Sequence, residues 1–317
     1  MFKINVRVMK KPNGIQKICL PAPAKINLFL AVPRIRADGF HEIFSVLAKL
    51  ELQDLISIEA TSQENELTFE CIGTKQLEGV DNLVLQAVRV WRELTKVQLG
   101  FRLILKKRIP IEAGLGGGSS DAVSTLIGLN SFLDTPLTYH ALHNLSLKIG
   151  SDCPSFLTSG LCIAEGRGDK ISSIEEPLLA DLMNREVLLF KPPIGFSTAE
   201  MYSKLVQSRA YSCDKQTSLL FSSWIKGKLP TEDFLFNQFQ STVFSKHLYY
   251  LPLFEEITLK FGIKPLLSGS GSCCFCLGKS GIRMEEVEEV IRKAWGEDCC
   301  LIRTRFRGKE KHSILFS

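Results

Sequence analysis

The feature that most constrains the fold is a glycine-rich segment, "GLGGGSSDA", which begins at Gly114. Residues 101–110 precede it, alternate like a β-strand and end at a proline, whereas residues 120–133 follow it with apolar side chains at helical spacing. Glycine is chosen where the backbone must approach another group closely or adopt a positive φ. A strand, a glycine loop and a helix N-terminus in succession predict a site for an anion, and specifically for a phosphate.

Two common phosphate motifs do not fit this segment. A Walker loop needs a lysine after its last glycine, and none follows here. The dinucleotide fingerprint needs a glycine three positions after Gly116, where Ser119 stands. A flexible linker is disfavoured because Ser119, Ser120 and Asp121 offer N-cap chemistry to a helix that starts at once.

Composition and charge indicate a globular protein. The chain has 317 residues, 45% of them hydrophobic and 23% charged, and a net charge of +5 that is spread along the sequence. The basic stretch near the C-terminus, "RTRFRGKEK", alternates as a half-exposed strand does, so we expect no nucleic-acid partner. There is no apolar run of about 20 residues and no secretory signal, so we expect no membrane association and a cytoplasmic protein.

The ten cysteines do not indicate a metal centre. Cys273 and Cys276 have a C-x-x-C spacing, but no second pair or histidine follows at a suitable distance. The stretch "CCFCLG" is typical of a buried strand, since cysteine is a small apolar residue. Irregular spacing of the ten residues also argues against a disulfide framework and favours a reducing compartment.

The order of predicted elements favours an α+β fold with two domains. Strands and helices mix without steady βαβ alternation. We place the boundary after the loop-like residues near 182, which gives domains of residues 1–182 and 183–317. Residues 52–60 and 66–72 are predicted to form a β pair, and the first twenty residues an extension that contains at most a strand.

Three further stretches carry polar residues suited to catalysis. "PAPAKINLFL" places Lys25 and Asn27 at a strand, "IGSDCPSF" places Asp152 in a polar turn after a helix, and "LLSGSGSCCF" is a second Gly/Ser loop. Taken singly, Lys25 is compatible with a solvated cation and Asp152 with an N-cap. Together with the glycine loop, however, they form a set.

This set resembles the three motifs of the GHMP small-molecule kinase superfamily. The "RADGFH" element and the triple glycine are similar to the branch that phosphorylates 4-diphosphocytidyl-2-C-methyl-D-erythritol, and the resemblance runs from about Pro21 to about Phe275. It implies an N-terminal mixed α/β domain with the phosphate loop and a C-terminal ferredoxin-like α+β domain. It also implies ATP and Mg²⁺ as cofactors and, as acceptor, a cytidine-diphosphate-linked alcohol that is phosphorylated on its 2-hydroxyl in the non-mevalonate isoprenoid pathway. We expect a monomer or a weak dimer.

The resemblance assigns roles to the residues that match its motifs. Asp152 would take the proton from the attacking hydroxyl, Lys25 would lower the pKa of that hydroxyl, and Asn27 would orient the alcohol. The acceptor pocket would add the rings of Phe40 and Tyr202 stacked on the cytosine, the polar edge of His41, and Thr198. The residues expected at ATP, in part through backbone N–H groups, are Asn82, Lys107, Pro110, Gly114, Leu115, Gly116, Gly117, Gly118, Ser119 and Ser120. Ser119 or Ser120 would touch Mg²⁺ or a phosphate oxygen, and no metal site made of protein ligands alone is expected.

Several alternatives stay open at this level. A GHMP kinase for homoserine, mevalonate or a sugar is one, although "RADGFH" with Tyr202 suits a cytosine better. A ligand-binding protein of the same fold without catalysis is another, although it would have no use for both Lys25 and Asp152. The sequence also departs from the family where Glu112 and Ala113 replace glycines, and an acid so close to phosphates must point outward.

Overall fold

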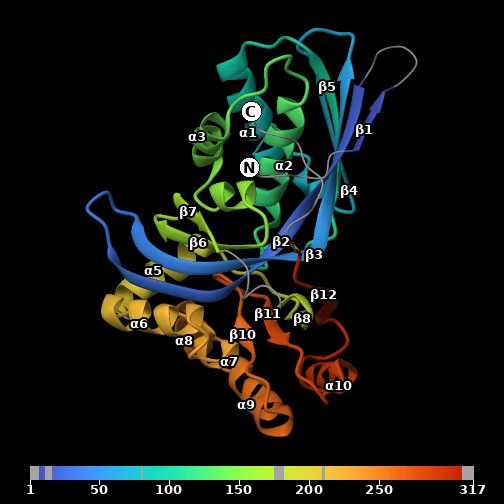
Figure 1. Ribbon diagram of the computed structural model, residues 1–317. Coiled ribbons are helices and arrows are strands. Elements are labelled where there is room, and N and C mark those ends of the chain that lie inside the picture. The colour runs from blue at the N-terminus through green and yellow to red at the C-terminus, as the bar shows by residue number, and fades with distance from the viewer. Residues whose placement is uncertain (1–6, 11–15, 80, 175–181, 209–210, 309–317) are drawn as a thin grey trace.

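The computed structural model describes residues 7–10, 16–79, 81–174, 182–208 and 211–308 (Figure 1). The chain folds around two β-sheets, one of eight strands and one of four, with helices packed against both. This arrangement confirms the predicted α+β class. None of the helices in the described ranges has the length and hydropathy needed to cross a bilayer.

The first sheet has the order β1-β2-β3-β5-β4, and β6, β7 and β9 extend it at β3 and β2. Its strands are β1 (Arg7–Lys10), β2 (Gln16–Ile35), β3 (His41–Thr61), β4 (Leu67–Ile72), β5 (Gly100–Lys106), β6 (Leu161–Gly166), β7 (Lys170–Ser173) and β9 (Phe236–Asn237). The pairing of β1 with the start of β2 shows that the first twenty residues contain a strand, while residues 1–6 and 11–15 lie outside the described ranges.

The predicted pairing of residues 52–60 with 66–72 is wrong, because β5 lies between β3 and β4. β5 pairs antiparallel with β3 and parallel with β4. Parallel neighbours need a crossover, and helix α1 (Leu83–Thr95) supplies it between β4 and β5. Its side chains at Val84, Ala87, Val88 and Trp91 are buried in the core on that sheet.

Helices α1, α2 (Gly117–Asn130) and α3 (Tyr139–Ile149) cover one face of this sheet, with the short 3₁₀ helices η1 (Lys75–Leu77) and η2 (Cys153–Leu157) beside them (Figure 1). Asn82 caps α1, since its side-chain oxygen accepts a hydrogen bond of 2.8 Å from the N–H of Val84. The predicted cap of α2 is wrong. The N-cap is Gly116 in the left-handed region, and Ser119 and Ser120 lie inside the first turn.

The second sheet is antiparallel throughout and has the order β10-β11-β8-β12. Its strands are β8 (Glu186–Lys191), β10 (Leu266–Leu267), β11 (Cys274–Leu277) and β12 (Cys300–Arg305). The helices around it are α5 (Thr198–Ser208), α6 (Asp214–Ile225), α7 (Thr231–Phe234), α8 (Phe239–Lys246), α9 (Tyr250–Phe261) and α10 (Met284–Trp295). All four residues of β11 are buried, which confirms the cysteine-rich stretch as a core strand.

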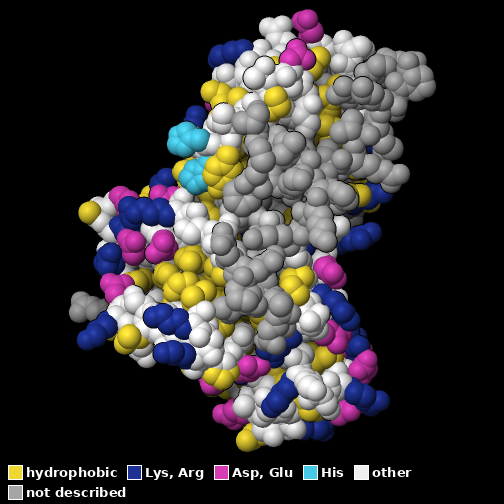
Figure 2. All heavy atoms as spheres, in the orientation of Figure 1, with side chains coloured by type: hydrophobic (Ala, Val, Ile, Leu, Met, Phe, Trp, Pro, Cys, Tyr) yellow, Lys and Arg dark blue, Asp and Glu magenta, His cyan; other side chains and the backbone are white. Residues whose placement is uncertain are grey.

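The long antiparallel strands β2 and β3 connect the two parts of the molecule (Figure 1). One hydrophobic core contains Ala24 and Val46 from these strands together with Val187 and Phe275 from the second sheet. Strand β9, late in the sequence, also pairs with β2. A boundary at residues 182/183 therefore stays a prediction. Figure 2 shows lysine and arginine side chains interspersed with acidic ones on the lower half of the face in view.

Candidate active site

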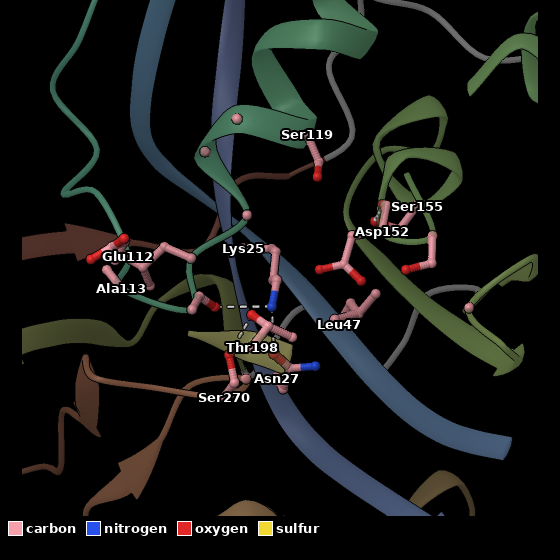
Figure 3. Close-up of a pocket in the computed structure, with 18 of the residues that line it drawn as sticks. Lys25, Asn27, Leu47, Glu112, Ala113, Ser119, Asp152, Ser155, Thr198 and Ser270 are labelled. Atoms are coloured by element: carbon pink, nitrogen blue, oxygen red, sulfur yellow. Dashed lines mark hydrogen bonds between the residues drawn. The ribbon is translucent and has the colours of Figure 1, made fainter. Parts of the chain in front are cut away.

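A cavity of about 450 Å³ lies where the glycine loop meets β2, β3, η2 and α5 (Figure 3). Its size suits a small-molecule ligand. Fourteen of the seventeen predicted site residues line it: Lys25, Asn27, Asn82, Lys107, Pro110, Gly114, Leu115, Gly116, Gly117, Gly118, Ser119, Asp152, Thr198 and Tyr202. The structure thus brings together residues that are distant in the sequence.

The glycine loop needs glycine for conformation and for space. Gly114 and Gly116 have φ values of +70° and +69°, which L side chains rarely adopt. A Cβ atom at Gly114 would collide with the carbonyl oxygen of Ser268, and one at Gly116 would lie 2.7 Å from Cζ of Phe156. Gly118 differs, because a Cβ there would meet only Leu83, at 3.5 Å. The loop is fixed by its packing and opens the N-terminus of α2 toward the cavity.

Lys25 lies on β2 and is 4% exposed. Its ammonium donates hydrogen bonds of 2.9 Å to the carbonyl oxygen of Gly114 and 2.7 Å to Oδ1 of Asn27 (Figure 3). Burial lowers the pKa of Lys25, the negative charge of Asp152 opposes this shift, and the positive charge of Lys49 adds to it. A cation is therefore held at the base of the phosphate loop in a site of low polarity.

Asp152 is the N-cap residue of η2, yet its side chain makes no capping hydrogen bond to the described backbone. The carboxylate instead faces the space beside Lys25 (Figure 3). The hydroxyl of Ser155 donates to the main-chain oxygen of Asp152 at 2.8 Å and so fixes the turn. A carboxylate that is exposed to the cavity and free of structural hydrogen bonds is suited to accept a proton.

Asn27 holds Lys25 in place as well as lining the cavity. Its Oδ1 accepts from the Lys25 ammonium, and its Nδ2 donates to the Ser45 hydroxyl at 2.8 Å. That hydroxyl donates in turn to the main-chain oxygen of Phe29 at 2.8 Å. One hydrogen of Nδ2 is thus used by Ser45, and the second remains for the predicted task of orienting an acceptor.

The second Gly/Ser loop, which contains Ser268 and Gly269, packs directly on Lys25 and Gly114. A Cβ at Gly269 would lie 3.1 Å from Nζ of Lys25, and the Ser268 hydroxyl donates to the oxygen of Gly114 at 3.1 Å. Ser270 lines the cavity, 2.9 Å from the hydroxyl of Thr198 on α5. Ser270 was missed among the site residues, although the "SGSGSC" motif that contains it was the signal.

Lys107 lies between two buried carboxylates. Its ammonium is 2.5 Å from Asp54 and 2.8 Å from Asp121. Burial raises the pKa of Asp121 to about 7, against the pull of the Lys107 charge. Lys107 thus anchors β5 to β3 and α2, and Asp121 serves that anchor rather than a helix cap. Asp54 was not predicted to take part. Its position as an acid inside the otherwise alternating strand of residues 52–60 was the sequence feature that could have indicated it.

Among the described residues, three predicted ligands do not line the cavity: Ser120, Phe40 and His41. Ser120 is fully buried and its N–H donates to the Gly116 oxygen within the helix, so its neighbour Ser119 is the serine that points into the cavity (Figure 3).

The tip of the β2–β3 hairpin meets α5 at the acceptor end of the cavity. The ring of His41 lies 4.6 Å from that of Tyr202, and its buried Nε2 has no hydrogen-bond partner among the described residues. Burial lowers the pKa of His41 and raises that of the Tyr202 phenol. Phe40 is 50% exposed, with the Arg167 guanidinium 5.3 Å from its ring centroid. These rings border the cavity but do not enclose it.

Glu112 points away from the Lys25–Asp152 pair (Figure 3). Its φ is +51°, and its side chain packs against Gly195, where no Cβ could fit beside the carboxylate. The acid in the glycine loop is therefore directed outward, as the sequence required.

A comparison with protein families matches residues 82–160 to the GHMP kinases N terminal domain. This segment contains the glycine loop, α2 and Asp152.

Relatives align along most of the chain. A 4-diphosphocytidyl-2-C-methyl-D-erythritol kinase of Persephonella marina is 33% identical over 279 residues, which cover 87% of this chain and 96% of the relative. The kinase of the same name from Bacillus cereus is 34% identical over 281 residues, covering 87% and 93%.

Solved structures give the same result. A crystal structure of 4-(cytidine 5'-diphospho)-2C-methyl-D-erythritol kinase superposes with a TM-score of 0.69 at 28% identity and covers 90% of this chain and 99% of its own. A mevalonate kinase shares the fold, with a TM-score of 0.68 at 16% identity over 92% and 99% of the two chains. By sequence and by fold, the chain belongs to the 4-diphosphocytidyl-2-C-methyl-D-erythritol kinase family of the GHMP kinases.

Proposed function

We propose that the protein transfers the γ-phosphoryl group of ATP to the 2-hydroxyl of 4-diphosphocytidyl-2-C-methyl-D-erythritol, a step of non-mevalonate isoprenoid synthesis. One observation carries the proposal most directly. Lys25 from β2 and Asp152 from η2 converge beside the glycine loop, with Lys25 hydrogen-bonded to the loop itself. Membership of the kinase family supports the use of ATP.

The chemistry follows from positions and charges, because phosphoryl transfer needs alignment and electrostatic stabilisation more than covalent catalysis. The acceptor oxygen attacks the γ-phosphorus, its proton passes to the Asp152 carboxylate, and ADP leaves. Lys25 donates a hydrogen bond to the acceptor oxygen and stabilises the negative charge that develops on it. Asn27 keeps Lys25 in this orientation.

The N–H groups at the start of α2, together with the helix dipole, would bind the ATP phosphates. Gly116 and Gly117 would present them without side chains in the way, and Gly118 would add its own N–H group. Asn82, Lys107 and Pro110 would line the nucleotide end of the same cavity. Leu115 and Ser119, which are also predicted at ATP, would line the same end of the cavity. Ser120 would contribute only through packing.

The donor set fits Mg²⁺ if phosphate oxygens and water supply most ligands, as is usual for this ion. The described residues contain no cluster of three or more metal-binding side chains, and the Ser119 hydroxyl points into the cavity. Ser119 would therefore hold the ion together with the phosphates. The ion would neutralise phosphate charge when bound.

At the acceptor end, the rings of His41 and Tyr202 would recognise the cytosine. The unpartnered Nε2 of His41 offers a polar edge to the base, and the Tyr202 phenol stays protonated and so can donate. Phe40 would close over the base from the hairpin tip, and Thr198 would contact the acceptor near Ser270.

We further propose that the protein is cytoplasmic and is a monomer or a weak dimer. Its active site would lie between domains of residues 1–182 and 183–317.

An ADP-release assay tests the proposal. The purified protein is supplied with ATP, Mg²⁺ and either 4-diphosphocytidyl-2-C-methyl-D-erythritol, mevalonate, homoserine or galactose. The cytidine compound should give a kcat/KM at least about tenfold above the others, because base stacking alone contributes ~1–3 kcal/mol. The Asp152→Asn protein, prepared in the same way, controls for contaminating kinases. A preference for one of the other alcohols would overturn the assignment of the acceptor.

A further inference from the structure

Lys49 is a buried cation for which the reaction just described has no role. It lies on β3 directly opposite Lys25 of β2, is 2% exposed, and does not line the cavity. Side chains at opposite positions of an antiparallel pair project from the same face of the sheet. Its ammonium has no hydrogen-bond partner among the residues that the structure describes.

The ring of Phe156 connects Lys49 to the active site. The Lys49 ammonium lies 4.2 Å from the centroid of this ring, at cation–π distance. Phe156 belongs to η2, whose N-cap is Asp152. It also packs against the glycine loop, since a Cβ at Gly116 would lie 2.7 Å from its Cζ and 3.1 Å from Cγ of Lys25. One ring therefore contacts the Lys49 ammonium and the phosphate loop.

Burial lowers the pKa of Lys49, and the Cys162 and Asp152 side chains oppose this shift. A buried ammonium without hydrogen bonds is therefore costly to keep in a folded protein. An apolar side chain of similar size would pack in the same space with neutral or better stability. The charged groups that face Lys49 are Lys25 from β2 and Asp152 from η2, together with the Cys162 thiol from β6. The main-chain N–H of Arg307 donates to the Lys49 oxygen and not to its side chain. The free-energy cost of burying the Lys49 ammonium thus arises next to Lys25 and Asp152, the two groups proposed to be catalytic.

We propose that Lys49 is a positioning residue for the phosphoryl transfer, whose ammonium, held against Phe156, acts as a fixed positive charge behind Lys25 and Asp152. The charge makes the Lys25 ammonium a stronger hydrogen-bond donor, in line with the lowered pKa of Lys25, to which Lys49 contributes. The Phe156 ring contacts both Lys49 and the glycine loop, and Lys49 does not line the cavity, so Lys49 acts through its neighbours. This inference rests on the proposed function for its catalytic consequence.

A pH profile separates this role from simple packing. Without the Lys49 charge, Lys25 keeps its proton to higher pH. The alkaline limb of the profile of kcat/KM should therefore move upward in Lys49→Met, by about one pH unit. Lys49→Arg keeps the charge and should restore the alkaline limb of the parent. A merely structural loss would lower kcat/KM at every pH without moving that limb.

Lys264→Met is the control, because Lys264 is an exposed lysine whose ammonium hydrogen-bonds to the main-chain oxygen of Leu235 outside the cavity. Its profile should match that of the parent. If Lys49→Met does not fold, Phe156→Leu removes the π face that stabilises the ammonium and should move the alkaline limb in the same direction. An alkaline limb that stays in place in a folded, active Lys49→Met or Phe156→Leu protein would overturn the proposal.

A second measurement does not depend on the acceptor. The pKa of Lys25 is followed by NMR of proteins labelled with [¹³Cε]lysine, with the Lys25 signal assigned through Lys25→Met. The pKa should rise in Lys49→Met and stay unchanged in Lys264→Met. An unchanged value in Lys49→Met would rule out the charge coupling, whether or not the protein turns over the cytidine compound. An inactive parent with a raised Lys25 pKa in the variant would instead count against the proposed function alone.

Discussion

The Lys25 ammonium donates a hydrogen bond of 2.9 Å to the carbonyl oxygen of Gly114, a residue 89 positions later in the chain. The main-chain N–H of Lys25 also donates to the carbonyl oxygen of Leu115 at 2.9 Å. Strand β2 and the glycine loop are thus joined by a backbone and a side-chain hydrogen bond. Lys25 and the glycine loop form one structural unit, and a change in either should affect both.

Replacing Asp152 by asparagine should reduce kcat by ~10²–10⁴, the usual contribution of a general base. The amide keeps the shape of the side chain, so the affinities for ATP and acceptor should be retained. Steady-state kinetics with a fluorescence titration of ATP would measure both. Asp134→Asn, at an exposed loop carboxylate, is the control. Turnover of folded Asp152→Asn within about threefold of the parent would contradict the role of a base.

Replacing Lys25 by methionine should lower kcat to a similar extent, because the acceptor oxygen loses its donor. The double variant with Asp152→Asn should lose less than the product of the two single losses, because residues that act as a unit are not additive. A double-mutant cycle in kcat measures this coupling. Strict multiplication of the two effects would mean that the residues act independently.

Gly116→Ala should weaken ATP binding and lower stability, whereas Gly118→Ala should do neither. At Gly116 the positive φ costs an alanine ~1–2 kcal/mol, and the new methyl group meets Phe156 at 2.7 Å. At Gly118 the nearest atom is at an ordinary 3.5 Å. Calorimetric ATP titration and thermal unfolding of both variants test the contrast. Equal behaviour of the two alanines would show that the loop is looser than its packing indicates.

Tyr202→Ala should raise the KM for the acceptor about 5- to 150-fold with little effect on ATP affinity, since stacking on a base contributes ~1–3 kcal/mol. Phe40→Ala should have a smaller effect, because that ring is half exposed and outside the cavity lining. Tyr249→Ala, at a partly exposed ring outside the cavity, is the control. Unchanged binding of cytidine diphosphate to Tyr202→Ala would exclude stacking at this position.

The raised pKa of Asp121 predicts a stability that changes with pH. The folded protein holds a proton on Asp121 up to about pH 7, whereas the unfolded chain releases it near pH 4. Between these values the folded state binds more protons, so the free energy of unfolding falls as pH rises, by at most about 1.4 kcal/mol per pH unit. Relative to Asp121→Asn, the parent should lose stability through this window in urea denaturation. A constant difference from pH 4 to pH 7 would refute the shift.

The gathering of Lys25, Asp152 and the glycine loop at one cavity could be predicted because each lies in a short motif, while their catalytic roles stay predictions. Alternation of apolar residues predicted the strand before the loop, and helical spacing predicted the helix after it. Contacts between distant segments could not be predicted in the same way. That Asp54 would meet Lys107 and Asp121 depends on the placement of β5 between β3 and β4, which no local pattern encodes.

The predicted cap of α2 failed for a related reason. Ser119, Ser120 and Asp121 have good capping side chains, and propensity places them at the helix start. The chain begins the helix at Gly117 instead, because the close approach of Phe156 and Lys25 holds Gly116 in the left-handed region. Tertiary packing therefore overrode local preference at the residue where a phosphate would bind.

The β2–β3 hairpin has a consequence for how acceptor preference can change during evolution. Lys25 lies in its body, opposite Lys49, and His41 lies at its tip, opposite Ile35. Eight positions of β3 separate Lys49 from His41, a span of at most about 26 Å at the usual rise per residue. Under the proposed function, substitutions at the tip would therefore alter which alcohol is chosen while the transfer machinery stays intact, and the two properties would diverge independently among descendants of one ancestral gene.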